Sequence, residues 1–343
     1  MNIEIGKEQL IVAEHGPDVS SEMAITASQE LKNAFRTLRG TQIASRSTRA
    51  ARAIAAVNAI RLPYPLQMEA MNTFHEAQEL SRNTRGQMQA ATCVFAPPHT
   101  GKTTAASNFV EVANDKATDG KRVLLISMGT GGGPLEMYRQ ILIQLGEGFP
   151  ATKDLAIMRA RAIEAMIDAG VELLIIDEVH EAGRQIGRSS SFTAELKTLL
   201  NGGHVGIVLL GTDHAKKMIY ADQELSMRTM APCNFGALDW NNEEDRALWI
   251  GFLSALDTKM VQLGIVSSAT DLADQELAMA LWTVCQGVIG QLMNVMKQAI
   301  RISIYENREF ITIDDLALAV EDRLIATNLC AVNTVDLLAE QRA

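Results

Sequence analysis

The sequence APPHTGKT, residues 96–103, follows a short apolar run, ATCVFA (91–96), and precedes a run typical of a helix (102–116). A loop in this strand–loop–helix context can wrap its backbone N–H groups around phosphates, and the positive end of the helix dipole adds to the attraction. In such a GKT motif the lysine reaches the β- and γ-phosphates and the threonine hydroxyl binds Mg²⁺. The stretch therefore predicts a nucleotide site in which Lys102 and Thr103 take these two roles.

The loop itself departs from the usual motif at one position. Ala96 stands where the first glycine is usual, and glycine serves that position through its freedom in φ. The expected nucleotide is ATP, with Mg²⁺ as its metal. The loop residues expected to surround ATP are Pro97, Pro98, His99, Thr100, Gly101, Lys102, Thr103 and Thr104.

A second motif, LLIIDE (173–178), places two acids directly after an apolar run. Asp177, at the end of a buried strand, would hold Mg²⁺ together with Thr103. Glu178 would polarise the water that attacks the γ-phosphate. Acids after a strand can also simply start a helix, but their position about 75 residues after the GKT motif favours the catalytic reading.

The surrounding pattern predicts an α/β fold. Apolar runs at 91–96, 122–127, 171–177 and 205–212 alternate with helical stretches, and CNFGAL (233–238) offers a weak fifth strand. Near-continuous apolar strands separated by helices predict a parallel sheet, here of five strands, covered on both faces. After Trp240 the segments 242–263, 271–284, 287–306 and 313–326 all read as helices.

We therefore expect four regions. They are a helical, Arg-rich N-terminal extension (1–62), an α/β nucleotide-binding domain (63–240), a helical lid (241–328) and a C-terminal tail (329–343).

Charge is unevenly distributed in this acidic chain, whose net charge is −10. Residues 31–68 contain no acid and seven bases. Such asymmetry is typical of a surface that binds DNA, RNA or an acidic partner. A helix face that is simply exposed to solvent would show the same charge pattern.

Cysteine spacing and hydropathy bear on location. The four cysteines form no CxxC pair, which disfavours a zinc site or a disulfide framework and fits a reducing cytoplasm. The first ten residues lack the order of a signal peptide, and no apolar stretch has the length of a membrane span. We therefore expect a cytoplasmic protein without a membrane segment.

Taken together, the motifs resemble those of an AAA+ ATPase. APPHTGKT, LLIIDE, LLGT (209–212) and the arginine of ELSMR (224–228) follow the order of that class, and the helical module resembles its lid. Within the class the chain resembles the TniB/TnsC-type ATPases that regulate DNA transposition, over about residues 60–320. The stretches that carry this resemblance are YPLQMEAMNTF (64–74), IIDEVHE (175–181), LLGTDHA (209–215), GVIGQLMNVMKQAI (287–300) and FITIDDL (310–316).

The resemblance implies further site residues. Thr212 would be the sensor that reads the γ-phosphate or the attacking water, although a turn threonine is the alternative. Arg228 would reach the nucleotide of a neighbouring subunit, although a plain surface arginine is the alternative. Gln291 stands where the lid usually carries a basic sensor, a role that Lys297 could take instead. The expected catalytic set is Lys102, Glu178, Thr212 and Arg228, and the candidate DNA contacts are Arg139, Arg184 and Arg188.

The resemblance also implies partners. The expected protein is a homo-oligomer, a ring or helical filament on double-stranded DNA, that links target-selector proteins to a transposase and disassembles on ATP hydrolysis. An alternative that keeps the fold and changes the partner is a secretion ATPase or a replication-initiation loader. An alternative from another functional class is a nucleotide-locked scaffold that binds ATP but barely hydrolyses it. A small-molecule P-loop kinase is disfavoured by the large helical lid.

Overall fold

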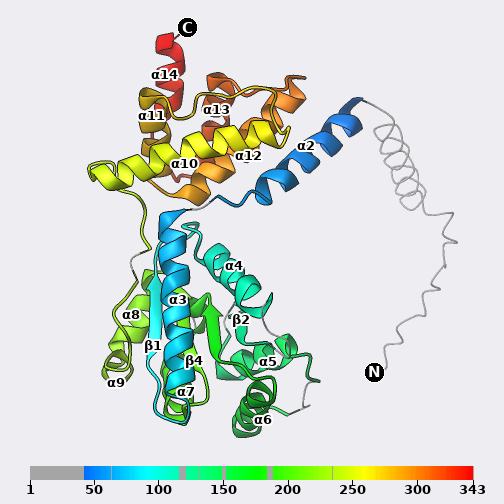
Figure 1. Ribbon diagram of the computed structural model, residues 1–343. Coiled ribbons are helices and arrows are strands. Elements are labelled where there is room, and N and C mark those ends of the chain that lie inside the picture. The colour runs from blue at the N-terminus through cyan, green and yellow to red at the C-terminus, as the bar shows by residue number, and fades with distance from the viewer. Residues whose placement is uncertain are drawn as a thin grey trace, which may run out of the picture.

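The computed structural model describes residues 42–62, 64–115, 121–130, 132–148, 152–183, 188–233 and 235–342. Figure 1 shows an α/β body below and a bundle of helices above it. The body contains a parallel sheet in the order β1-β4-β3-β2. Its strands are β1 (Ala91–Phe95), β2 (Val123–Ser127), β3 (Leu173–Asp177) and β4 (Gly206–Gly211). The predicted parallel α/β sheet is confirmed.

Each face of the sheet packs against its own helices because successive side chains of a strand point to opposite faces. In β3, Leu173 and Ile175 join the core on one side, whereas Leu174 and Ile176 join the core on the other. The first core includes residues of α3 (Pro65–Asn83) and α4 (Lys102–Asp115). The second includes residues of α5 (Pro134–Gln144), α6 (Leu155–Asp168), α7 (Arg188–Gly202), α8 (Asp213–Ala221) and α9 (Gln223–Ser226).

The strand predicted at 233–238 is wrong, since four strands form among the described residues. The chain instead runs irregularly beside β1. The backbone of Ala91 accepts from Met230 and donates to Arg228, and the Cys93 carbonyl accepts from Cys233. Pro232 lies between these contacts and has no N–H to donate, which prevents a regular ladder there.

The lid consists of α10 (Glu243–Gln262), α11 (Gln275–Cys285), α12 (Ile289–Tyr305), α13 (Ile313–Val320) and a short π-helix (Glu321–Ile325). Its core is apolar, and buried Trp249 donates its indole N–H to the Ala278 carbonyl at 3.0 Å. Two helices from outside 241–328 pack into the same core, α2 (Gln42–Asn58) and α14 (Thr334–Arg342). The domain limits at 62, 240 and 328 stay a prediction.

In the part of the chain that is described, no single helix is long and apolar enough to cross a membrane; α11 and α12 meet the criteria only as a pair bent by 109°.

Candidate nucleotide-binding site

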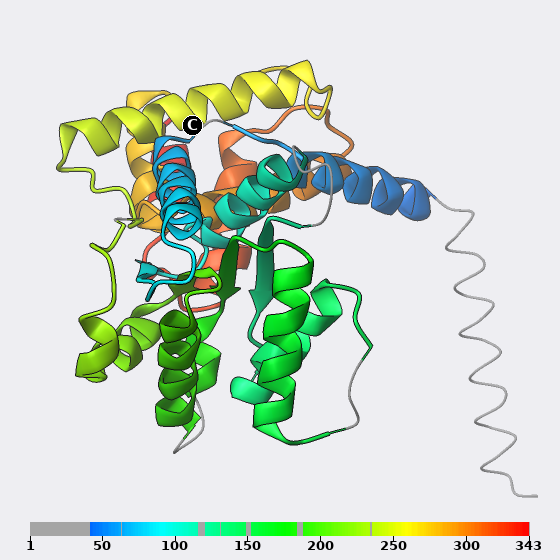
Figure 2. The same cartoon turned by 60° about the horizontal axis from the view of Figure 1, so that its bottom comes forward.

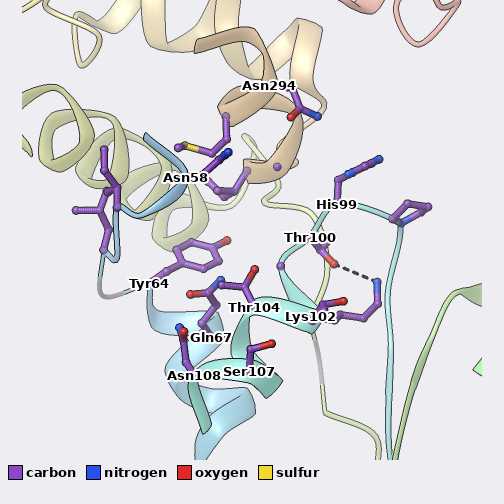
Figure 3. A pocket seen from close by; sticks show the side chains of 18 of the residues that line it. Asn58, Tyr64, Gln67, His99, Thr100, Lys102, Thr104, Ser107, Asn108 and Asn294 are labelled. Atoms are coloured by element: carbon purple, nitrogen blue, oxygen red, sulfur yellow. Dashed lines mark hydrogen bonds between the residues drawn. The ribbon is translucent and has the colours of Figure 1, made fainter. Parts of the chain in front are cut away.

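The phosphate loop connects β1 to α4 at the carboxyl edge of the sheet. It curls around the Lys102 ammonium, which donates to the Ala96 carbonyl at 2.9 Å and to the Pro97 carbonyl at 2.7 Å. Lys102 also lies 3.4 Å from the Thr100 hydroxyl, as the dashed line in Figure 3 shows. Only 8% of Lys102 is exposed, and this burial lowers its pKa, opposed by the nearby acids. The loop thus holds a cation at its centre, as a phosphate site requires.

The departure at Ala96 does not disturb this loop. The left-handed positions fall at His99, with φ 63°, and at Gly101, with φ 100°. Ala96 instead continues β1, and its N–H donates to the Gly211 carbonyl at 3.0 Å. Glycine's freedom in φ is therefore needed at Gly101 and not at position 96.

The acid pair lies directly beside the loop, at the end of β3. The Thr103 hydroxyl donates to Asp177 Oδ2 at 2.5 Å, and Asp177 Oδ1 accepts from the Glu178 N–H at 2.7 Å. Asp177 is buried, with 3% exposed. A hydroxyl and a carboxylate are the hard oxygen ligands that Mg²⁺ prefers, so these two residues fit the predicted metal.

Glu178 is presented differently from Asp177. Its backbone is left-handed, with φ 57°, and its side chain is 47% exposed. The His180 Nε2 lies 3.0 Å from Glu178 Oε2. The carboxylate therefore reaches the cavity described below while an imidazole holds one of its oxygens.

Thr212, the residue after β4, does not cap the helix that it precedes. It occupies the N-cap position of α8, but its side chain makes no capping bond. Its hydroxyl is buried and has no partner among the described residues. Buried hydroxyls are usually paired, so this one is available to a bound ligand.

These groups meet at a cavity of about 680 Å³ between the sheet and the lid. Nine of the predicted site residues line it. They are Pro98, His99, Thr100, Gly101, Lys102, Thr103, Thr104, Glu178 and Thr212. Pro97 and Asp177 do not line the cavity. The Pro97 carbonyl accepts from the Lys102 ammonium, and the Asp177 carboxylate accepts from the Thr103 hydroxyl.

Sequence reasoning missed the other end of the cavity. Asn58, Tyr64 and Gln67 line this end together with Asn294 of the lid, and Figure 3 labels all four. Phe252 and Met293 also line this end. These residues come from segments far apart in the chain and belong to no spaced motif. Only the YPLQ stretch, quoted for the family resemblance, carried a signal.

The lid touches the phosphate loop directly. The Gly290 N–H, in the first turn of α12, donates to the His99 carbonyl at 3.0 Å. Gly290, Asn294 and Lys297 share the cavity-lining face of α12. Gln291 does not line the cavity, and its side-chain oxygen is buried without a partner in the described structure. Burial is the main cause that lowers the pKa of Lys297.

The close approach at Gly290 yields a test. A Cβ at this position would lie 2.2 Å from the His99 carbonyl oxygen, so Gly290→Ala must push the lid away from the loop. Overpacking of this kind costs about 1–3 kcal/mol, which corresponds to about 5- to 150-fold weaker ATP binding by calorimetry. Gly251→Ala is the matched control, because a Cβ there meets nothing within 4 Å. It should raise the free energy of unfolding by about 0.5–1 kcal/mol and leave ATP affinity unchanged. Equal affinity in both variants would contradict a role for the lid contact.

Two of the predicted arginines, Arg228 and Arg139, do not line this cavity. The Arg228 carbonyl accepts from the N–H of Ala91, which begins β1, so Arg228 lies at the opposite edge of the sheet from the phosphate loop. Its side chain donates to Asn201 Oδ1 at 2.7 Å. Arg139 lies on α5, where its guanidinium nitrogen is 3.8 Å from a carboxylate oxygen of Glu136. Arg184 lies outside the described residues, and Arg188 begins α7 without a described side chain. Their roles stay predictions.

Comparisons with known proteins agree with the motifs. No match was found among curated proteins. The chain is similar in structure to the ORC2 protein of Aeropyrum pernix in ADPNP–ADP complexes, with 14% identity, a TM-score of 0.52 and coverage of 72% of this chain and 67% of that one. It is also similar to Cdc6p of Pyrobaculum aerophilum, with 12% identity, a TM-score of 0.57 and coverage of 77% and 69%. A third similar structure is the Aeropyrum pernix ORC1 protein in complex with DNA. Its identity is 12% and its TM-score 0.55, and the match covers 76% of this chain and 66% of that one.

At these identities the likeness shows the fold alone, which is the AAA+ fold. The family follows from the sequence, since residues 54–232, just over half of the chain, match the profile described as bacterial TniB protein. The predicted resemblance is thereby confirmed: the chain belongs to the TniB family and has an AAA+ fold.

Proposed function

We propose that this protein is a Mg²⁺-dependent ATPase that assembles on double-stranded DNA and regulates transposition. The observation that carries the ATPase proposal is the meeting of Lys102, Thr103, Glu178 and Thr212 at one cavity, with Asp177 behind Thr103. TniB family membership supports the link to transposition. The ORC2 and ORC1 structures, which contain ADPNP and ADP in one case and DNA in the other, support a nucleotide and a DNA ligand.

Lys102 would hold the phosphates. Its ammonium now donates to backbone carbonyls of its own loop, and these bonds can be exchanged for bonds to the β- and γ-phosphate oxygens. Thr103 and Asp177 would hold Mg²⁺, which supplies positive charge beside the phosphates. The base and ribose would occupy the end of the cavity lined by Asn58 and Tyr64.

Hydrolysis would then depend on Glu178. Its carboxylate would accept a proton from the attacking water, whose oxygen forms a bond to the γ-phosphorus as the bond to the β-phosphate oxygen breaks. The unpaired Thr212 hydroxyl would orient this water or the γ-phosphate. Arg228, which lies outside its own cavity, would complete the site of a neighbouring subunit, and this makes assembly part of the mechanism.

In the cell, ATP binding would build the oligomer on DNA and hydrolysis would dismantle it. The assembly would link target-selector proteins to a transposase. Such a switch requires that the ATP-bound and ADP-bound states differ in their affinity for DNA or for the neighbouring subunit.

Negative-stain imaging with duplex DNA tests this proposal. We expect rings or filaments on DNA in the presence of ATP and bare DNA in its absence. Lys102→Ala should abolish assembly because ATP is not held, whereas Glu178→Gln should retain it because ATP is held but not cleaved. A protein that binds ATP but does not assemble on DNA at any salt concentration would refute the transposition proposal and leave the ATPase proposal standing.

A further inference from the structure

Helix α2 precedes the α/β body in the sequence but packs on the lid. Ala50 and Val57 are buried in the lid core. The Ser47 hydroxyl lies 2.8 Å from the Tyr305 hydroxyl, at the end of α12. Figures 1 and 2 both show α2 beside the lid, with its first residues extending away from the molecule. A movement of α12 must therefore carry α2 with it.

The solvent face of α2 is basic. Arg49 and Arg52 are exposed and Arg46 is half-buried, while no acid occurs between residues 42 and 68. None of these three arginines forms an ion pair within the described residues. Arg49 donates to the Arg308 carbonyl at 3.1 Å, a contact that orients its guanidinium and leaves its charge uncompensated.

Over residues 45–58, where the side chains of α2 are described, the other exposed side chains are small or polar, and none is aromatic or a large aliphatic. They are Ser45, Ser47, Thr48, Ala51, Ala55 and Asn58. Protein–protein interfaces usually depend on a buried aromatic or aliphatic anchor, which the exposed side chains of residues 45–58 do not offer. Arginines on a smooth surface suit a phosphate backbone instead, because the guanidinium fork matches phosphate oxygens.

The end of α2 is also part of the nucleotide cavity. Val57 and Asn58 line it, as do Ile60, Arg61 and Leu62 of the following segment. Arg61 folds back to the Asn58 carbonyl at 2.9 Å, which closes this segment on the end of the helix. A nucleotide in the cavity would therefore touch the residues that connect α2 to the α/β body.

We infer that α2 is an arm carried by the lid, that Arg49 and Arg52 on it bind backbone phosphates of duplex DNA, and that ATP in the cavity sets its position. This inference rests on the proposed function and deepens it. It also has a thermodynamic consequence: if ATP tightens DNA binding by some factor, DNA must tighten ATP binding by the same factor.

The test is the double variant Arg49→Gln/Arg52→Gln, compared with Arg161→Gln/Arg342→Gln. The control removes two arginines whose ion pairs are at the surface, on α6 and α14. Duplex affinity is measured against salt concentration with a non-hydrolysable ATP analogue. Loss of two phosphate contacts should reduce the slope of log affinity against log salt by about 2 and weaken binding on the order of 50-fold at about 0.1 M salt. The control should match the wild type.

A second measurement separates contact from structure. In the double variant, ATP affinity without DNA should equal that of the wild type, while the tightening of ATP binding by DNA should be lost. Reduced ATP affinity without DNA would show that the arginines support the cavity, which overturns the inference. Unchanged DNA binding in the double variant would overturn it too, with the proposed function intact. A wild-type protein that binds poly-glutamate through these arginines but binds no DNA would refute both and assign α2 to an acidic protein.

Discussion

Glu178→Gln is expected to slow ATP hydrolysis by about 10²- to 10⁴-fold and to leave ATP binding intact. An amide cannot accept the proton of the attacking water, which is the role proposed for this carboxylate. Folding should be unaffected. Glutamine adopts the left-handed backbone at this position no less readily than glutamate, and its side-chain oxygen can keep the contact with His180. Phosphate release under saturating ATP, together with calorimetry for ATP binding, measures the two effects separately.

Glu164→Gln is the control for this charge change, because Glu164 is exposed on α6 and lies outside the cavity. It should hydrolyse ATP at the wild-type rate. If Glu178→Gln also retained that rate, Glu178 would not be the base, and the proposed mechanism would be wrong at its central step.

Lys102→Ala is expected to abolish the stabilisation of the protein by ATP. A ligand at 100 times its dissociation constant raises the free energy of unfolding by about 2.7 kcal/mol, and a variant that does not bind gains nothing. The nucleotide-free protein should lose at most about 1–3 kcal/mol of stability, because removing the ammonium leaves the Ala96 and Pro97 carbonyls without their donor, while relief of the ammonium's desolvation offsets part of that loss. Thermal unfolding with and without Mg²⁺ and ATP measures both effects.

Lys216→Ala provides the comparison, since Lys216 is exposed on α8 and does not line the cavity. Its thermal stabilisation by ATP should equal that of the wild type. Full stabilisation of Lys102→Ala would mean that the nucleotide does not occupy the phosphate loop.

The end of the candidate site that contains the loop and the acid pair could be predicted from sequence because local segments build it. Lys102 and Thr103 lie in one loop, and Asp177 and Glu178 follow one strand, so parallel pairing alone brings them to the same edge of the sheet. The opposite end of the cavity could not, because Tyr64 and Phe252 approach each other only through the docking of the lid. Their rings lie 5.8 Å apart although the residues are 188 positions apart in the chain.

The fifth strand and the sensor position on the lid could not be predicted reliably either, because both depend on contacts between segments that are distant in the sequence. An apolar run at 233–238 resembled a strand, but its backbone contacts go to two different parts of the molecule: the Cys233 N–H donates to the Cys93 carbonyl of β1, whereas the Leu238 N–H donates to the Gly287 carbonyl of the lid. In α12, Gln291 and Lys297 were both candidates for the sensor. The docking of Gly290 against His99 turns Lys297, and not Gln291, to the cavity.

By itself, the sequence determined the α/β class, the phosphate loop, the acid pair and the family. These depend on hydrophobic periodicity and on residues close together in the chain, and local geometry constrains both. The tertiary structure alone decided which face of α12 meets the loop, which residues close the end of the cavity away from the loop, and that α2 packs on the lid. Contacts between distant segments follow from how apolar surfaces fit together in three dimensions, and no short stretch of sequence records that fit.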